Sequence, residues 1–392
     1  MPAPLLLDLT HTSHTRARTG IQRVARSLHL ALGHGAVPIT HDPHRGAWRQ
    51  LEAWELENLS DRSAAAKRSA HWPLTAKLLG QAARWTGRAK TVLPPNSGLL
   101  VPEVFSPSVA GVFHGLFANV QGPRVAVFHD AIALQFPELS PLKTVARFPN
   151  YLRELLAFDG IAANSETSRD ALRDYWKWLG VTNAPPVEAI LLGVDLPIRV
   201  ATPPSEHGDR LPTVLCVGTL EGRKNHVALL EACEQLWARG GRFELRLIGL
   251  ANRETGAAAV ARLRALQAAG RPLRYDGALG EGAVAAAYAD CAFTVYPSIV
   301  EGFGLPVIES LAHGKPCICS GRGALGESAR GGGCVSLDAV DAGSVAEAIA
   351  GLLGSREKLT KLASEARWRK FRQWPDYASD LSAWLHELSR RN

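Results

Sequence analysis

Short apolar runs that are typical of strands alternate with stretches of helical periodicity along most of the 392 residues. Repeated strand-helix-strand units fold into a parallel sheet with helices on its faces. Strands are expected at 5–9, 124–129, 160–164, 214–217, 244–248, 292–296 and 316–320. Helices are expected near 20–32, 141–157, 166–179, 225–239, 256–269, 306–313 and 344–353. The pattern predicts the α/β class with doubly wound sheets.

The alternation is interrupted by a proline-rich stretch, and 392 residues are many for a single core. We therefore expect two domains, at 1–196 and 213–365, joined by a linker at 197–212 and followed by a helical tail at 366–392. In doubly wound sheets, ligands bind beyond the carboxyl ends of the strands. Two facing sheets would share one cleft.

The composition, 46% hydrophobic and 21% charged, excludes a disordered chain or a coiled coil. Seven cations against Asp61 give the 61–90 stretch a charge of +6, out of a total of +7. This stretch can be helical, with a break near Pro73, and it also contains Trp72 and Trp85. It is either a solvated helical face or a docking surface for anionic lipid headgroups. Nothing else in the chain is typical of a nucleic-acid-binding module, so no nucleic acid partner is expected.

The cysteines and the hydropathy indicate the compartment. All six cysteines lie in the second half without a CxxC pair, which favours free thiols in a reduced setting and no zinc site. No stretch approaches the ~20 apolar residues of a membrane span, and the run at 5–7 is short for a signal peptide. We expect a cytoplasmic protein, peripheral on the inner face of the membrane if the basic stretch binds lipid.

Two candidate sites lie in the first half. Thr19 and Gln22 have capping-box spacing around Gly20, which would let an anionic ligand approach the amides of a helix N-terminus. The alternative is a capped helix without a ligand. His129 and Asp130 end a buried strand, where they could contact a sugar hydroxyl or a phosphate. The alternative is a turn with a hydrogen-bonded histidine.

A third candidate site follows the strand at 214–217. Gly218 permits close backbone approach, and Arg223 and Lys224 precede a helix that Asn225 can cap. Two adjacent cations at a helix start suit a diphosphate, which needs charge neutralisation and several donors. The alternative is a surface loop with two solvated cations.

The most specific candidate site is the stretch 297–309, Pro-Ser-Ile-Val-Glu-Gly-Phe-Gly-Leu-Pro-Val-Ile-Glu. A strand enters a loop with two glycines, and Pro306 sits where the first helical residue is expected. Glu301 lies on the loop and Glu309 in the expected first turn. Each carboxylate can accept hydrogen bonds from a ribose or sugar hydroxyl, and the loop amides at 302–305 can bind a ligand.

These stretches together resemble the retaining glycosyltransferases of family 4, or glycosyltransferase group 1. The 297–309 stretch resembles their Glu-x7-Glu signature, and 217–225, 163–169 and 192–195 give supporting matches. The 19–23 loop and the His129-Asp130 pair resemble a subset of mannosyltransferases in bacterial surface polysaccharide synthesis. The resemblance extends over almost all of the second half of the chain, but over only a few short separate stretches of the first half.

The resemblance implies the GT-B fold, in which two Rossmann-like domains face a central cleft. The acceptor would bind to 1–196 and the donor to 213–365, and the tail at 366–392 would cross back to the first domain. It implies these donor-binding residues: Gly20, Gly218, Arg223, Lys224, Glu301, Gly302, Phe303, Gly304, Leu305 and Glu309. It implies these catalytic residues: His129, Asp130, Glu301, Arg223 and Lys224.

In this scheme Arg223 and Lys224 hold the diphosphate, Glu309 the ribose, and Glu301 with the loop amides the transferred sugar. The nucleobase would lie near 249–252 and 275–279. The sequence contains no Asp-x-Asp, so we expect no metal and no cofactor besides the nucleotide-sugar donor.

The expected reaction moves a hexose from a nucleotide diphosphate sugar to a glycan or polyprenyl-linked acceptor. Mannose or a deoxyhexose carried by GDP is favoured, with retention by same-face attack. Two alternatives are a non-catalytic nucleotide-sugar-binding protein and a sugar-nucleotide epimerase of similar fold.

Overall fold

A computed structural model describes residues 3–16, 20–60, 71–196 and 211–391. The described chain forms two compact units. Unit 1 comprises residues 1–130, 147–193 and 374–392, and unit 2 comprises 131–146 and 194–373. The linker expected at 197–212 lies almost entirely outside the described residues, as does the 61–70 part of the basic stretch.

Unit 1 is built on a seven-stranded sheet with the order β3-β2-β1-β4-β5-β6-β7. Every neighbouring pair is parallel except β2 and β3, which are antiparallel. The strands are β1 (Leu5–Asp8), β2 (Ala36–Asp42), β3 (Ala47–Gln50), β4 (Leu99–Val101), β5 (Arg124–Phe128), β6 (Gly160–Ala163) and β7 (Val187–Ala189). The central strands lie in the interior of the unit, where Leu6, Leu100 and Val127 have no exposed surface.

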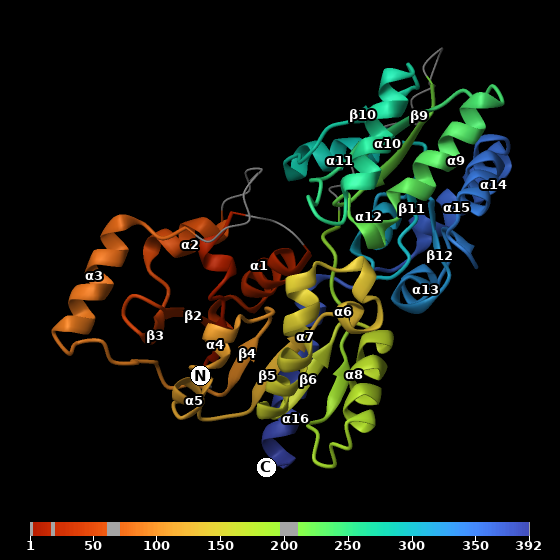
Figure 1. The fold of residues 1–392 in the computed structure, drawn as a ribbon. Helices are drawn as coiled ribbons and strands as arrows, with labels where there is room; N and C mark the ends of the chain where they lie inside the picture. Colours follow the sequence, from red (N-terminus) through yellow and green to blue (C-terminus); the bar gives the residue numbers. More distant parts are fainter. Residues whose placement is uncertain (1–2, 17–19, 61–70, 197–210, 392) are drawn as a thin grey trace. The chain divides into compact units, whose positions relative to one another are not determined.

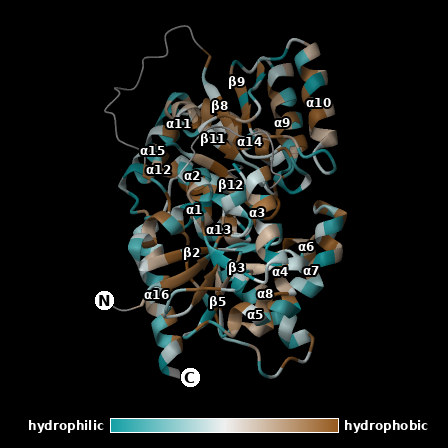
Figure 2. Ribbon diagram, turned by 90° about the vertical axis from the view of Figure 1, so that its left-hand side faces the viewer, coloured by the Kyte–Doolittle hydropathy of each residue, from teal (hydrophilic) through white to brown (hydrophobic). Residues whose placement is uncertain are grey.

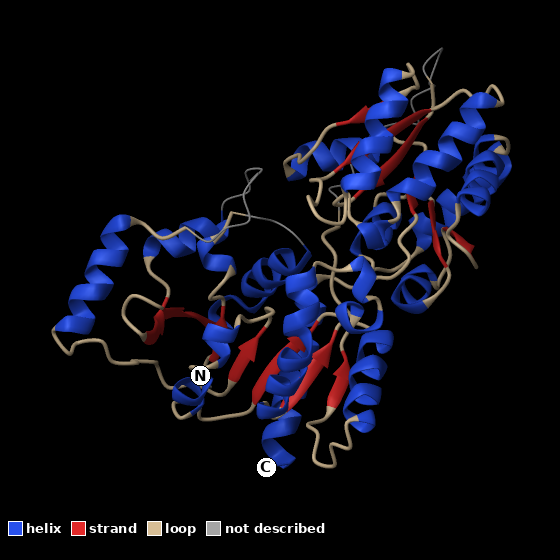
Figure 3. Cartoon of the chain, viewed as in Figure 1, coloured by secondary structure: helices blue, strands red, loops and turns tan. Residues whose placement is uncertain are grey.

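The helices of unit 1 lie over its sheet and beyond its β3 edge, as Figures 1 and 3 show. They are α1 (Gly20–Leu32), α2 (Ala53–Ser60), α3 (Leu74–Trp85), α4 (Pro107–Ala110), α5 (Phe113–Phe117), α8 (Glu166–Trp178) and α16 (Trp374–Arg391), with α7 (Leu142–Glu154) divided between the units. The C-terminal helix α16 packs against α1. It also covers β6, where a Cβ added to Gly160 would lie 2.6 Å from Leu388 Cδ1.

Unit 2 is built on a six-stranded parallel sheet with the order β10-β9-β8-β11-β12-β13. Its strands are β8 (Thr213–Val217), β9 (Glu244–Ile248), β10 (Leu273–Tyr275), β11 (Phe293–Tyr296), β12 (Cys317–Ser320) and β13 (Cys334–Leu337). Its helices are α6 (Ile132–Gln135), α9 (His226–Ala238), α10 (Ala257–Ala268), α11 (Glu281–Asp290), α12 (Leu305–Ala312), α13 (Gly323–Ala329), α14 (Ala342–Leu353) and α15 (Arg356–Trp368).

The apolar core of unit 2 lies between the sheet and helices α9, α10 and α14. Hydrophobic residues concentrate on the strands, which are predominantly brown in Figure 2. All six cysteines are free thiols. Among the described residues, no helix combines the length and the apolar character needed to cross a membrane. The expected α/β class is confirmed.

Candidate active site

Two loops meet at the carboxyl ends of strands β8 and β11 in unit 2. Strand β8 leads through Gly218 to a 3-10 turn at Gly222–Lys224, and β11 leads into the loop before α12. The backbone amide of Ile299 donates to the carbonyl of Arg223 at 2.9 Å, which joins the two loops. Asn225 stands at the N-cap position of α9, as expected, but its side chain makes no capping hydrogen bond: its backbone is left-handed, and its Nδ2 donates to the Val340 carbonyl at 2.6 Å.

The joined loops bring two cations onto one carboxylate. Arg223 Nη1 lies 2.5 Å from Glu301 Oε2, and Lys224 Nζ lies 2.6 Å from Glu301 Oε1. Arg223 also pairs with Glu221 at 2.7 Å. Tyr296, the last residue of β11, donates to Glu301 Oε1 at 2.9 Å and accepts from Lys224 Nζ. We call these five residues the charge cluster.

The charge cluster is balanced without a ligand. Burial alone would raise the pKa of Glu301, but the charges of Arg223 and Lys224 outweigh it and lower that pKa. Glu301 is therefore ionised at neutral pH, and with Glu221 it opposes the two cations. A diphosphate that binds these cations must displace a carboxylate or share the cations with it, because like charges at such distances repel.

The loop before α12 ends at a glycine that no other residue can easily replace. Gly304 has φ +99°, and a Cβ there would lie 2.9 Å from Leu325 Cδ2. Ser328 Oγ of α13 supports the loop by donating to the Phe303 carbonyl at 2.5 Å. Gly304 and Ser328 therefore hold the end of this loop next to the start of a helix, where an anion is favoured.

Helix α12 begins one residue earlier than the sequence indicated. Leu305 is its first residue, so Pro306 is the second, and Glu309 lies beyond the first turn. The Glu309 side chain is buried, and Tyr288 of α11 donates to its Oε2 at 3.3 Å. Tyr288 in turn stacks on His313, with ring centroids 4.7 Å apart. Glu309 thus belongs to unit 2 with the charge cluster, but it has a partner of its own.

We expect Gly304→Ala to destabilise the protein by about 1–3 kcal/mol and to weaken nucleotide binding, because the left-handed backbone and the contact with Leu325 both oppose a Cβ. Gly282→Ala is the matched control, since a Cβ there meets nothing within 4 Å and the residue lies inside a helix. Denaturant unfolding and nucleotide titration measure the two effects. Equal stability of the two variants would contradict the assignment of a fixed loop.

Gly218 lies beside the charge cluster, and the two segments expected to bind the nucleobase lie against each other. A Cβ on Gly218 would be 3.8 Å from Lys224 Cε and 3.8 Å from Tyr296 Cε2. Gly249 donates its amide to the Gly277 carbonyl at 2.7 Å, and Tyr275 Oη donates to the Gly249 carbonyl at 2.9 Å. The segments 249–252 and 275–279 therefore meet at the carboxyl ends of β9 and β10.

The other predicted residues, Gly20, His129 and Asp130, belong to unit 1. Gly20 starts α1, and a Cβ there would meet nothing within 4 Å, so packing does not require glycine at this position. Thr19 and its expected capping box lie outside the described residues. The structure thus groups the predicted site into a unit 2 set and a unit 1 set.

His129 is buried at the end of β5, and its Nε2 donates to the Pro102 carbonyl at 2.8 Å. Burial lowers its pKa, against an opposing effect of that carbonyl and of Asp130, so the ring is neutral at pH 7. With Nε2 protonated, Nδ1 is the acceptor nitrogen. His129 is therefore suited to accept a hydrogen bond from a hydroxyl at Nδ1 rather than to donate one there.

Two buried carboxylates in unit 1 were not identified from the sequence. Glu103, after β4, accepts from the backbone amides of His11 and Thr12 at 2.9 and 2.8 Å and so fixes the loop that follows β1. Asp8 ends β1 and accepts from the amide and the hydroxyl of Thr10 at 3.0 and 2.5 Å. Both were detectable as acidic residues directly after apolar strands.

Burial raises the pKa of Asp8 from 3.8 to about 7. The folded state then binds more protons than the unfolded state between pH 4 and 7, so we expect the free energy of unfolding to fall as the pH rises through this window. Asp8→Asn should remove this loss, which amounts to about 2–4 kcal/mol. Unfolding midpoints at pH 4.5 and 7.5 test it, and a variant with the wild-type pH dependence would contradict the assignment.

Tyr296 and Tyr288 are the partners in unit 2 that the sequence analysis missed. Tyr296 directly precedes the 297–309 stretch, so its place at a strand end was a usable signal. Tyr288 carried none, because it reaches Glu309 from a different helix.

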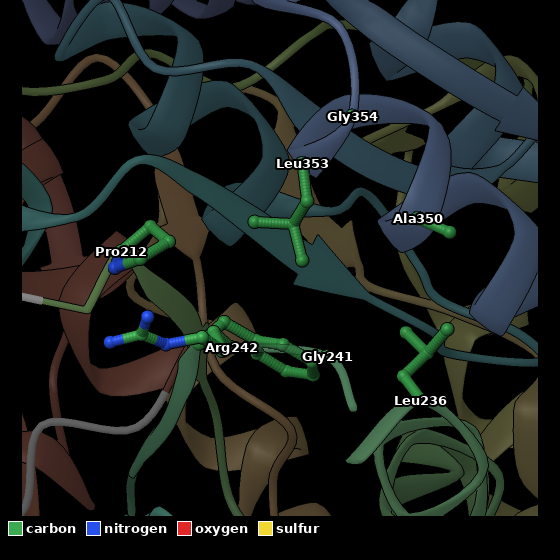
Figure 4. Close-up of a pocket in the computed structure, with 8 residues that line it drawn as sticks. Pro212, Leu236, Gly241, Arg242, Ala350, Leu353 and Gly354 are labelled. Atoms are coloured by element: carbon green, nitrogen blue, oxygen red, sulfur yellow. The ribbon is translucent and has the colours of Figure 1, made fainter. Parts of the chain in front are cut away.

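The pocket drawn in Figure 4 lies at the opposite end of the unit 2 sheet. Pro212 and Phe243 directly precede β8 and β9, which places the pocket at the amino ends of these strands. Its other lining residues are Leu236, Gly241, Arg242, Ala350, Leu353 and Gly354. It is therefore separate from the charge cluster.

Comparisons with known proteins bear on the family and the fold. Residues 201–369 match the family described as "Glycosyl transferases group 1". The serotype-specific mannosyltransferase WbdA of Escherichia coli is 26% identical over 333 residues, which cover 80% of this chain and 38% of WbdA. The O-antigen chain mannosyltransferase B of Escherichia coli is 34% identical over 136 residues, which cover 33% of this chain and 34% of that protein. The chain thus spans well under half the length of these relatives.

Solved structures with a similar fold cover both units. A sucrose-phosphate synthase from Thermosynechococcus elongatus has a TM-score of 0.68 at 18% identity, with both chains fully covered. HepE from Anabaena, solved in complex with UDP and glucose, has a TM-score of 0.69 at 15% identity, with 98% of this chain and 99% of HepE covered. The chain therefore has the GT-B fold, and its residues 201–369 match the glycosyl transferases group 1 family.

Proposed function

We propose that the chain is a retaining hexosyltransferase that transfers mannose, or a related deoxyhexose, from a GDP-sugar to a glycan or polyprenyl-linked glycan. The observation that carries the proposal is the charge cluster, in which Arg223 and Lys224 converge on Glu301 within a group 1 domain. The sugar is taken from the names of the two mannosyltransferase relatives. The family match favours transfer over the epimerase alternative.

In this proposal the donor diphosphate binds to Arg223 and Lys224, and Glu309 holds the ribose. The cations stabilise the charge that develops on the leaving phosphate, which makes a divalent metal unnecessary. Gly218 gives the phosphates access to the backbone beside Lys224. Glu301 moves from the cations to the hydroxyls of the transferred sugar when the diphosphate arrives.

We further propose same-face attack, with the leaving phosphate oxygen accepting the proton of the acceptor hydroxyl. Retention through a covalent intermediate would need Glu301 as the nucleophile. In this proposal Glu301 binds the hydroxyls of the transferred sugar, so it is not placed to attack the anomeric carbon. From unit 1, His129 accepts a hydrogen bond from a sugar hydroxyl at Nδ1, and Asp130 orients the acceptor.

The test is incubation with GDP-mannose, GDP-deoxyhexoses, UDP-sugars and dTDP-sugars in the presence of a chelator, with nucleoside diphosphate release as the readout. We expect GDP release from a GDP-sugar, and NMR of the product should show the anomeric configuration of the donor. Release that requires a divalent metal would contradict metal independence. A glycosyl adduct trapped on Glu301 would overturn same-face attack.

We place this activity at the cytoplasmic face of the membrane, where a polyprenyl-linked acceptor would be presented. This placement is tested by fractionation of cells that express the full chain. Recovery outside the cytoplasmic and membrane fractions would contradict it.

A further inference from the structure

Helix α3 carries four large apolar side chains that are mostly exposed. Leu74, Leu78, Leu79 and Trp85 are 72%, 58%, 63% and 91% exposed. At 100° per residue, Leu74, Trp85 and Leu78 fall within one arc of about 40°, and Leu79 lies on the adjoining side. We call these four residues the α3 apolar face.

The opposite side of α3 is fixed to unit 1. Ala76 and Gly80 are buried, and a Cβ on Gly80 would lie 2.8 Å from the Cβ of His44 in the turn between β2 and β3. The small residues let the helix backbone lie directly on this turn. Because that contact sets the rotation of the helix, the α3 apolar face points away from the unit. In Figure 1, α3 lies at the edge of unit 1, beyond β3.

Positive charge accompanies this face. Lys77 and Arg84 flank it on the same helix, and Arg88 and Lys90 follow directly. The sequence has no aspartate or glutamate between Asp61 and Glu103. An apolar helical face bordered by cations, with a tryptophan at its end, has the composition of a helix that lies in a membrane interface.

The two tryptophans of the 61–90 stretch have different surroundings in the structure. Trp72 stacks on His14, with ring centroids 4.0 Å apart, and Arg49 lies over its ring. Trp72 therefore packs within unit 1 and is not an interface residue, whereas Trp85 is exposed. The leucines of α3, which the charge pattern did not single out, provide most of the apolar surface.

We propose that α3 docks unit 1 onto an anionic phospholipid bilayer, with the α3 apolar face inserted among the headgroups and Lys77 and Arg84 on the lipid phosphates. Four large exposed apolar side chains favour a bilayer, and the absence of acids in the segment matches an anionic surface. This inference goes beyond sugar transfer and does not depend on it, because docking requires neither donor nor acceptor.

The test is flotation of the full chain with vesicles of phosphatidylglycerol and phosphatidylcholine, and with pure phosphatidylcholine. We expect binding to the anionic vesicles that weakens with salt. Leu78→Ser with Trp85→Ser should reduce it at least tenfold, because their apolar surface no longer enters the bilayer. Lys77→Gln with Arg84→Gln should reduce it about thirtyfold, because each cation near an anionic surface adds to the attraction.

Matched control variants test whether a loss of vesicle binding is specific to α3 or follows from any change of exposed apolar or charged residues. Leu142→Ser with Trp178→Ser removes side chains that are 77% and 78% exposed elsewhere, and Lys358→Gln with Lys361→Gln removes two other exposed cations. Both controls should bind vesicles as the wild type does, and all variants should keep wild-type thermal stability.

Three results would overturn the docking proposal. The first is a wild-type chain that does not bind anionic vesicles, and the second is equal binding by the α3 variants and the controls. The third is a change of oligomeric mass in the α3 variants with vesicle binding intact, which would assign the α3 apolar face to a second copy of the chain. All three measurements can be made on a chain that turns over no donor sugar. A failure of the docking proposal can therefore be told apart from a failure of the proposed sugar transfer.

Discussion

Arg223→Ala and Lys224→Ala should each lower the turnover of the donor sugar by about 10²–10³-fold, because each variant removes a cation that stabilises the leaving phosphate. Arg223→Lys should restore only part of the loss, since an ammonium cannot replace the two-pronged contact of a guanidinium. Steady-state release of nucleoside diphosphate measures the effect.

The control for this comparison is Arg271→Ala, which removes an arginine that pairs with Glu234 at 2.6 Å on the surface of unit 2. It should keep wild-type turnover, since exposed ion pairs contribute little. Turnover within threefold of the wild type in both Arg223→Ala and Lys224→Ala would remove the basis for metal-independent stabilisation of the leaving group.

Glu301→Gln should lower the free energy of unfolding of the ligand-free chain by about 1–4 kcal/mol, because two cations lose the buried carboxylate that they share. Nucleoside diphosphate should stabilise this variant more than the wild type, since the added phosphates replace the missing charge and need not displace a carboxylate. Turnover should remain measurable, because same-face attack does not use Glu301 as a nucleophile.

The matched control for Glu301→Gln is Glu231→Gln, which breaks an exposed pair with Arg262 at 2.8 Å and should change stability by less than about 1 kcal/mol. Thermal unfolding with and without GDP compares the two. If GDP stabilises Glu301→Gln no more than the wild type, the carboxylate does not compete with the diphosphate for the cations.

Seven strands were predictable from their apolar runs, whereas the strands at the edges of both sheets were missed. The apolar runs at 124–129, 214–217 and 244–248 correspond to β5, β8 and β9 within one residue. The sequence analysis missed β2, β3, β4, β7, β10 and β13. Four of these, β3, β7, β10 and β13, are the edge strands of the two sheets, and β2 has a proline and polar residues that hide its pattern.

The site was predictable as far as its loops follow strands. Arg223, Lys224 and Glu301 were placed in one site from their positions after β8 and before α12, and the structure brings them into direct contact. Their pairing with each other was not predictable, because a sequence motif shows which groups meet a ligand and not where they rest without it. Helix α12 begins one residue early because Gly304, with its left-handed backbone, stands at the N-cap position. The sequence shows that residue 304 is a glycine, but not that its backbone is left-handed.

The central claim is that Arg223 and Lys224 hold the donor diphosphate by charge alone. Calorimetric titration of GDP into the wild-type chain and the Arg223→Ala/Lys224→Ala double variant, both in excess chelator, tests it most directly. The account predicts binding by the wild type and at least a 100-fold loss in the double variant, with the fold retained by circular dichroism. Equal GDP affinity in the two proteins, or wild-type binding only when a divalent metal is added, would contradict it.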